Sequence, residues 1–184
     1  MDGPRAMLIF CGYFPKLITP AQPALNIVGV QDICSISQCL AHSPPGWINH
    51  WQHNSLGLFD TIQQALSVIP EAEASAYELF GYRFSRQMFD KGHATPWAVP
   101  ELPCEQPGRE FVSVGFDAVS KTANSDLFEH SPLSCNRAAE TLARNEHCLF
   151  STLEEAVAGA MTFSTGATYE PGPYYVAQVL RRKT

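Results

Sequence analysis

The sequence predicts an α+β protein built from two similar β-loop-α-β halves, arranged as a ferredoxin-like sandwich with an extra N-terminal strand. Two observations lead to this fold class: the segment Asn54–Ile69 resembles Asn145–Ala160, and strand-like runs flank both segments. A third is the composition, because 45% apolar and 16% charged residues are typical of a compact globular chain. At 184 residues the chain is long enough for one domain with a substantial core.

The N-terminal run Ala6–Phe14 predicts the extra strand. Its apolar stretch is far shorter than the roughly 20 residues of a membrane helix, and it lacks the cleavage site of a secretory signal. We therefore expect no membrane association, a cytoplasmic location and reduced thiols. The cysteines concerned are Cys11, Cys34, Cys39, Cys104, Cys135 and Cys148.

Each half is predicted to begin and end with a strand. The first strands are Leu25–Ser37 and Phe111–Ser120, which share a Val-Gly step followed by an aspartate. The last strands are Ala76–Phe84 and Pro173–Arg181, which are rich in the aromatic and β-branched residues that favour sheets.

A short amphipathic helix is predicted inside each half. The two copies share five of sixteen positions: Asn54/Asn145, Leu58/Leu149, Phe59/Phe150, Thr61/Thr152 and Ala65/Ala156. Capping boxes are expected at Asp60-x-x-Gln63 and Ser151-x-x-Glu154, followed by apolar residues at helical spacing. The likeness favours an internal duplication; the alternative is that well-capped amphipathic helices resemble one another.

The predicted pseudo-repeats are residues 25–84 and 111–182, joined by a proline-rich connector over 88–110. Two βαβ units in succession favour a ferredoxin-like sandwich, with helices on one face of a mainly antiparallel sheet. The long loops of the two units then occupy comparable places. A cleft between the halves is therefore the expected site.

The first long loop, Cys39–Ser55, concentrates aromatic and polar side chains. We expect ligand-binding residues here because pockets combine an apolar wall with a few polar groups: Trp47, His50, Trp51, His53 and Asn54. The spacing of His50 and His53 also suits a metal, but no further ligands stand in register, so we assign no metal ligand. The alternative is a loop packed on the sheet, with hydrogen-bonded histidines.

The second long loop, Phe128–Asn145, contains the candidate nucleophile Cys135. A helix predicted over Arg137–Arg144, with Asn136 as its N-cap, would lower the thiol pKa through the helix dipole. His130 is the predicted catalytic base, and Asn136 a further ligand-binding residue. The alternatives for Cys135 are a buried apolar role and metal ligation.

These features favour a small cytosolic protein that binds, or binds and transforms, a small polar molecule in the inter-half cleft. The first alternative is a protein-interaction module of the inhibitor or immunity type, whose partner is a protein; the second is a metal-dependent enzyme. A formal charge of −6 argues against a nucleic-acid partner. No phosphate-cradling or dinucleotide-binding motif occurs, so we predict no cofactor.

Overall fold

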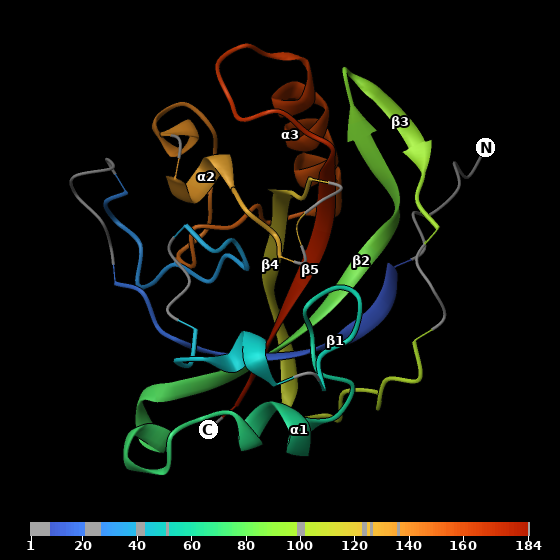
Figure 1. Ribbon diagram of the computed structural model, residues 1–184. Helices are drawn as coiled ribbons and strands as arrows, with labels where there is room; N and C mark the ends of the chain where they lie inside the picture. The colour runs from blue at the N-terminus through green and yellow to red at the C-terminus, as the bar shows by residue number, and fades with distance from the viewer. Residues whose placement is uncertain are drawn as a thin grey trace.

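The protein is an α+β fold with one antiparallel five-stranded sheet and few helices, which confirms the predicted class (Figure 1). The computed structural model describes residues 8–20, 27–39, 43–50, 52–98, 102–122, 125, 127–135 and 137–183. The strands are β1 (Leu8–Leu17), β2 (Tyr77–Asp90), β3 (His93–Pro96), β4 (Phe111–Ser120) and β5 (Tyr174–Arg182). The helices are α1 (Ile62–Ser67), α2 (Pro132–Cys135) and α3 (Leu153–Thr165), with 3-10 turns at Trp47–Asn49, Glu71–Ala76 and Ala138–Glu140.

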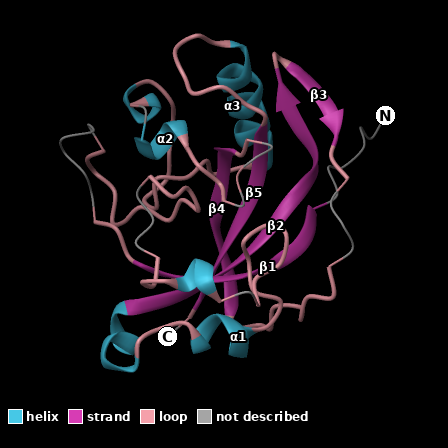
Figure 2. Cartoon of the chain, viewed as in Figure 1, coloured by secondary structure: helices cyan, strands magenta, loops and turns pink. Residues whose placement is uncertain are grey.

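Loops make up most of the chain outside the sheet (Figure 2). Helix α3 packs against β5, β4 and β2, whereas α1 packs against β1. Figure 1 shows these two helices near opposite ends of the strands. Among the described residues, no helix combines the length and apolar character needed to cross a bilayer.

The strand order is β1-β2-β5-β4, and each neighbouring pair is antiparallel. β1 and β3 pair with successive stretches of β2. A ferredoxin-like sandwich is not confirmed, because a βαβ crossover joins parallel strands. Here the two strands that flank α1, β1 and β2, pair directly with each other and are antiparallel, as are β4 and β5 around α3.

The run Leu25–Ser37, predicted as a strand, is not one over its described residues. It forms only isolated bridges, such as that between Ile33 and Thr19. The backbone N–H groups of Gln31 and Cys34 donate instead to the carbonyls of Glu146 and His147, at 2.7 and 3.1 Å. The segment therefore lies against the second half, and the predicted extra strand, β1, is the first strand of the first half.

The two asparagine loops make matching contacts with the edge strands. In each, the side-chain amide donates to a strand carbonyl, while its oxygen accepts two backbone N–H groups. The partners of Asn54 are Cys11, Leu56 and Leu58, and those of Asn145 are Val114, His147 and Leu149. Both asparagines thus hold a tight turn against the edge of the sheet.

Each loop also meets a glycine at a bulge of its edge strand. Gly12 has φ +132° and Gly115 has φ +143°, and the register of the ladder shifts at both positions. A Cβ on Gly12 would lie 2.7 Å from the carbonyl oxygen of Phe59. One on Gly115 would lie 2.9 Å from that of Phe150. The loops approach the strands closely because these positions have no side chain.

We expect Gly12→Ala and Gly115→Ala each to lower the free energy of unfolding by about 1–3 kcal/mol, because both dihedral strain and steric overlap follow. Urea denaturation of each variant measures the loss. Gly166→Ala is the matched control, since Gly166 has φ −97° and a Cβ there meets only ordinary contacts. Equal stability of all three variants would contradict the close approach of the asparagine loops to Gly12 and Gly115.

The strand registers relate the two halves about the centre of the sheet. Gly12 pairs with Tyr82 on β2, and Gly115 pairs with Val179 on β5. Tyr82 and Val179 are in turn paired with each other across the β2–β5 ladder. The bulge glycine of each edge strand is therefore paired with one member of the same central residue pair.

Both helices begin one residue later than predicted. The capping boxes are Thr61 with Gln64 and Thr152 with Glu155, because the threonines are the last extended residues and their side chains accept the N3 amide. α1 ends after six residues. Leu66 and Met161, which the helical spacing assigns to the buried stripe, are 42% and 41% exposed.

Candidate functional site

The predicted residues of the first loop that the structure describes, Trp47, His50, His53 and Asn54, range from buried to exposed. Trp47 is buried, and its ring packs edge-on against Phe14 with centroids 4.7 Å apart. His53 packs against the same indole at 5.5 Å, and Asn54 holds its own turn. His50 is exposed. Trp47 and His53 therefore fit the alternative interpretation, in which the loop packs on the sheet.

Two predicted ligand-binding residues, Trp51 and Asn136, lie outside the described residues.

The second loop brings the two predicted catalytic residues together, and a third residue joins them. One ligand atom each from Cys39, His130 and Cys135 lies within 4.8 Å of the others. The Sγ of Cys39 is 2.9 Å from Nδ1 of His130. Cys39 is exposed and the other two are half-buried. We call these three residues the thiol–imidazole cluster.

Backbone contacts between the halves position this cluster. The N–H of Gln38 donates to the carbonyl of Phe128 at 2.9 Å, which carries the end of the first-half segment onto the second half. The carbonyl of His130 accepts from the N–H of Ser120 at the end of β4, at 2.8 Å. Cys135 closes α2, and its thiol donates to the carbonyl of Ser131 at 3.1 Å.

The predicted activation of Cys135 is wrong. The helix expected over Arg137–Arg144 is only the 3-10 turn Ala138–Glu140, and Arg137 ahead of it has a left-handed φ of 62°. Cys135 ends a four-residue helix rather than preceding one. Burial, followed by the neighbouring Cys39, raises the pKa of the Cys135 thiol well above its ordinary value. Burial also raises the pKa of the Cys39 thiol.

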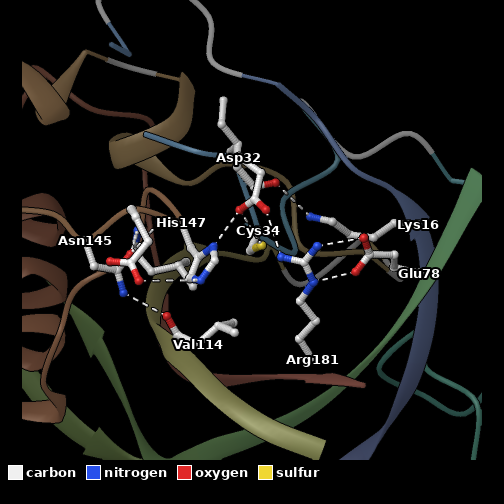
Figure 3. Close-up of polar contacts among 11 residues, drawn as sticks. Lys16, Asp32, Cys34, Glu78, Val114, Asn145, His147 and Arg181 are labelled. Atoms are coloured by element: carbon white, nitrogen blue, oxygen red, sulfur yellow. Dashed lines mark hydrogen bonds and ion pairs between the residues drawn. The ribbon is translucent and has the colours of Figure 1, made fainter. Parts of the chain in front are cut away.

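A second polar cluster surrounds Asp32 (Figure 3). Its Oδ1 lies 2.7 Å from Nδ1 of His147 and accepts from the Cys34 thiol at 3.1 Å. Its Oδ2 accepts from Arg181 at 2.8 Å, and Arg181 also binds both carboxylate oxygens of Glu78. Burial opposes ionisation of Asp32, but the hydrogen bonds from His147, Cys34 and Arg181 outweigh it and lower the pKa.

This second cluster connects four segments of the chain. Asp32, Cys34 and His147 also offer ligand atoms within 4.8 Å of one another, but the Arg181 guanidinium bound to Asp32 places a fixed positive charge beside them, which disfavours a cation. Lys16 lies beside Asp32, with Nζ donating to the carbonyl of Ser35 at 2.5 Å, and burial lowers the pKa of Lys16 to about 8. The arrangement suits a structural network that fixes the segment around Asp32 over the sheet.

A surface groove of about 680 Å³ lies elsewhere, beside α1 and the 3-10 turn that follows it. Its lining includes Leu66, Ile69, Tyr77, Glu78 and Arg182. Of the predicted site residues that the structure describes, none lines this groove.

Sequence reasoning assigned no role to Cys39. One signal points to its loop: the triplet His-Ser-Pro occurs at 42–44 and again at 130–132, close to Cys39 and Cys135 respectively. No protein-family model matches the chain, and comparisons with curated proteins and with solved structures found no match.

Proposed function

We propose that the protein binds a thiophilic divalent metal ion of the zinc class at the junction of its two halves. One observation carries this proposal: two thiols and an imidazole converge within 4.8 Å, from segments 91 residues apart in the chain. Cysteine sulfur and histidine nitrogen are the preferred ligands of zinc. The proposal departs from the sequence-based expectation of a small polar molecule and no metal ligand, and takes up the metal-ligand alternative for Cys135.

The geometry requires little movement for coordination. In a tetrahedral site with Zn–S distances of about 2.3 Å, two sulfurs stand roughly 3.8 Å apart, a spacing that fits inside the 4.8 Å limit of the cluster, while the Cys39 sulfur and Nδ1 of His130, now 2.9 Å apart, would separate slightly. A carboxylate oxygen of Glu170 lies 4.0 Å from Nδ1 of His130 and is a candidate for a fourth ligand. Two thiolates and a carboxylate favour a divalent over a monovalent cation.

The test is zinc titration of the metal-free protein, followed by elemental analysis. We expect one ion per chain, and Cys39→Ser, His130→Gln and Cys135→Ser should each weaken binding by about 100-fold or more. Cys104→Ser is the matched control, because the Cys104 thiol is half-buried and donates instead to Asp60 at 3.3 Å. Unchanged affinity in both cysteine variants of the cluster would exclude the site.

Zinc affinity should also rise steeply with pH. Burial raises the pKa of both cluster thiols, so both are protonated in the metal-free protein at neutral pH and both release a proton on binding. The apparent association constant should therefore rise about 100-fold between about pH 7 and about pH 8, and only about tenfold in Cys39→Ser. Competition with a chromophoric chelator at the two pH values measures the slopes. Equal slopes would show that Cys39 is not a ligand.

We also propose that residues 8–90 and 111–182 are copies of one β-loop-α-β unit. Matched asparagine turns, glycine bulges and threonine capping boxes support the duplication. The central pairing of Tyr82 with Val179 supports it independently of the sequence likeness. The first copy then begins at β1, earlier than the boundary of residue 25 predicted from the sequence.

A cytoplasmic location fits this function. All six cysteines are free thiols, and a metal site with two cysteine ligands requires a compartment that keeps them reduced.

A further inference from the structure

The two thiols of the cluster are neighbours as well as shared ligands. The sulfurs of Cys39 and Cys135 lie within 4.8 Å of each other. They differ in access to solvent, since Cys39 is exposed and Cys135 is half-buried. Cys11, Cys34 and Cys148 are buried. The thiol–imidazole cluster therefore contains one solvent-accessible thiol and, close to it, a second thiol that is less accessible.

We propose that Cys39 and Cys135 form a redox-active dithiol that exchanges with low-molecular-weight disulfides, with Cys39 as the attacking thiol. The Cys39 thiolate attacks one sulfur of the small disulfide, forming a mixed disulfide and expelling one small thiolate. The Cys135 sulfur then attacks the Cys39 sulfur and expels the second small thiolate, which takes up the proton that Cys135 gives up. Two protein thiols and one small disulfide thus become one protein disulfide and two small thiols.

His130 is the group that assists the first step. Its Nδ1 lies 2.9 Å from the Cys39 sulfur, within reach to accept the thiol proton as the thiolate forms. Access decides which cysteine reacts first, because the small disulfide must approach the attacking sulfur in line with its own S–S bond. Cys39, rather than the candidate nucleophile Cys135 predicted from the sequence, is therefore the attacking thiol.

Closure of the disulfide has a consequence for metal binding, which rests on the function proposed above. A disulfide removes two of the three ligands in the cluster, so the oxidised protein should not hold zinc. Conversely, bound zinc should protect both sulfurs from exchange. Oxidation would then release the ion.

The experiment treats the metal-free full-length protein with hydroxyethyl disulfide and follows the products by mass spectrometry. Wild type should become two hydrogen atoms lighter and yield a peptide pair linked through Cys39 and Cys135. Cys135→Ser should stop at a mixed disulfide on Cys39, and adding His130→Gln should slow that step by about tenfold or more. Cys39→Ser should leave Cys135 largely unmodified over the same period.

Cys104→Ser is again the control and should close the same disulfide as wild type. A wild type that stops at a mixed disulfide, or that reacts only at Cys104, overturns the inference. Repeating the reaction with one equivalent of zinc separates the two proposals. If the disulfide closes equally fast with and without zinc, the metal site fails while the dithiol stands. If zinc binds but no disulfide forms, the dithiol fails alone.

Discussion

Truncating Phe59 to alanine is expected to lower the free energy of unfolding by about 3–5 kcal/mol, and truncating Phe150 by a similar amount. Phe59 is fully buried, and its backbone exchanges two hydrogen bonds with Tyr13 of β1, at 2.8 and 2.9 Å. Phe150 is bound to Phe116 of β4 in the same way. The backbone of each phenylalanine therefore fixes the start of a helix to an edge strand. Because both rings are buried, truncating either side chain leaves a cavity at that junction.

The Phe150 ring also sits directly on α3. A Cβ on Gly159 would lie 2.5 Å from the tip of this ring, which shows how closely the helix backbone approaches it. Urea denaturation followed by circular dichroism measures both losses. Met161→Ala is the control on the same helix, because Met161 is 41% exposed and should change stability by no more than about 0.5 kcal/mol. Losses below about 1 kcal/mol for both phenylalanines would mean that neither anchors its helix.

The second large effect is expected at Asp32. Asp32→Ala should lower the free energy of unfolding at neutral pH by about 3 kcal/mol, because it leaves the partly buried Arg181 and His147 without a shared partner. This loss of stability is near the lower end of the range found when one partner of a buried ion pair is removed, because Arg181 keeps its contacts with Glu78. Chemical denaturation across a pH series measures it.

The pH dependence identifies the charge of Asp32 as the cause. Its pKa is lower in the folded than in the unfolded protein, so its contribution is present above the unfolded value of about 3.9 and is lost as the pH falls through the folded value. The difference between wild type and Asp32→Asn should therefore shrink on acidification. Glu146→Gln is the control, because its carboxylate is 60% exposed. A difference that stays constant down to about pH 2 would assign the effect to packing alone.

Much of the second half could be predicted from local signals. β4 has the predicted bounds, Phe111–Ser120, and β5 is shifted by one residue from Pro173–Arg181. These strands carry aromatic and β-branched residues that pack within the sheet, so propensity and tertiary structure agree. The run Leu25–Ser37 has a similar pattern, but its apolar residues are buried as an irregular segment. Its backbone donors find carbonyls near His147, which no local pattern encodes.

The candidate site was predicted in part, and for a reason that the structure corrects. His130 and Cys135 lie five residues apart in sequence, so their proximity could be anticipated. The helix dipole invoked to activate Cys135 does not exist, because positive φ at Arg137 interrupts the helical pattern. Cys39 reaches the site only because its segment crosses between the halves, a long-range contact invisible to spacing rules. The tryptophan-rich loop attracted attention by its composition, yet Trp47 serves the core.

The pairing of Tyr82 with Val179 has an implication for the history of the chain. Under the proposed duplication Tyr82 and Val179 are counterparts, and a central antiparallel pair of counterparts is the arrangement of an isologous homodimer. A single ancestral unit could therefore have formed the same sheet by pairing its last strand with that of a second copy. Once two copies are fused through the segment between β3 and β4, their sequences can diverge from each other. One copy could then acquire Cys39 and the other His130 and Cys135, on the two sides of the former interface.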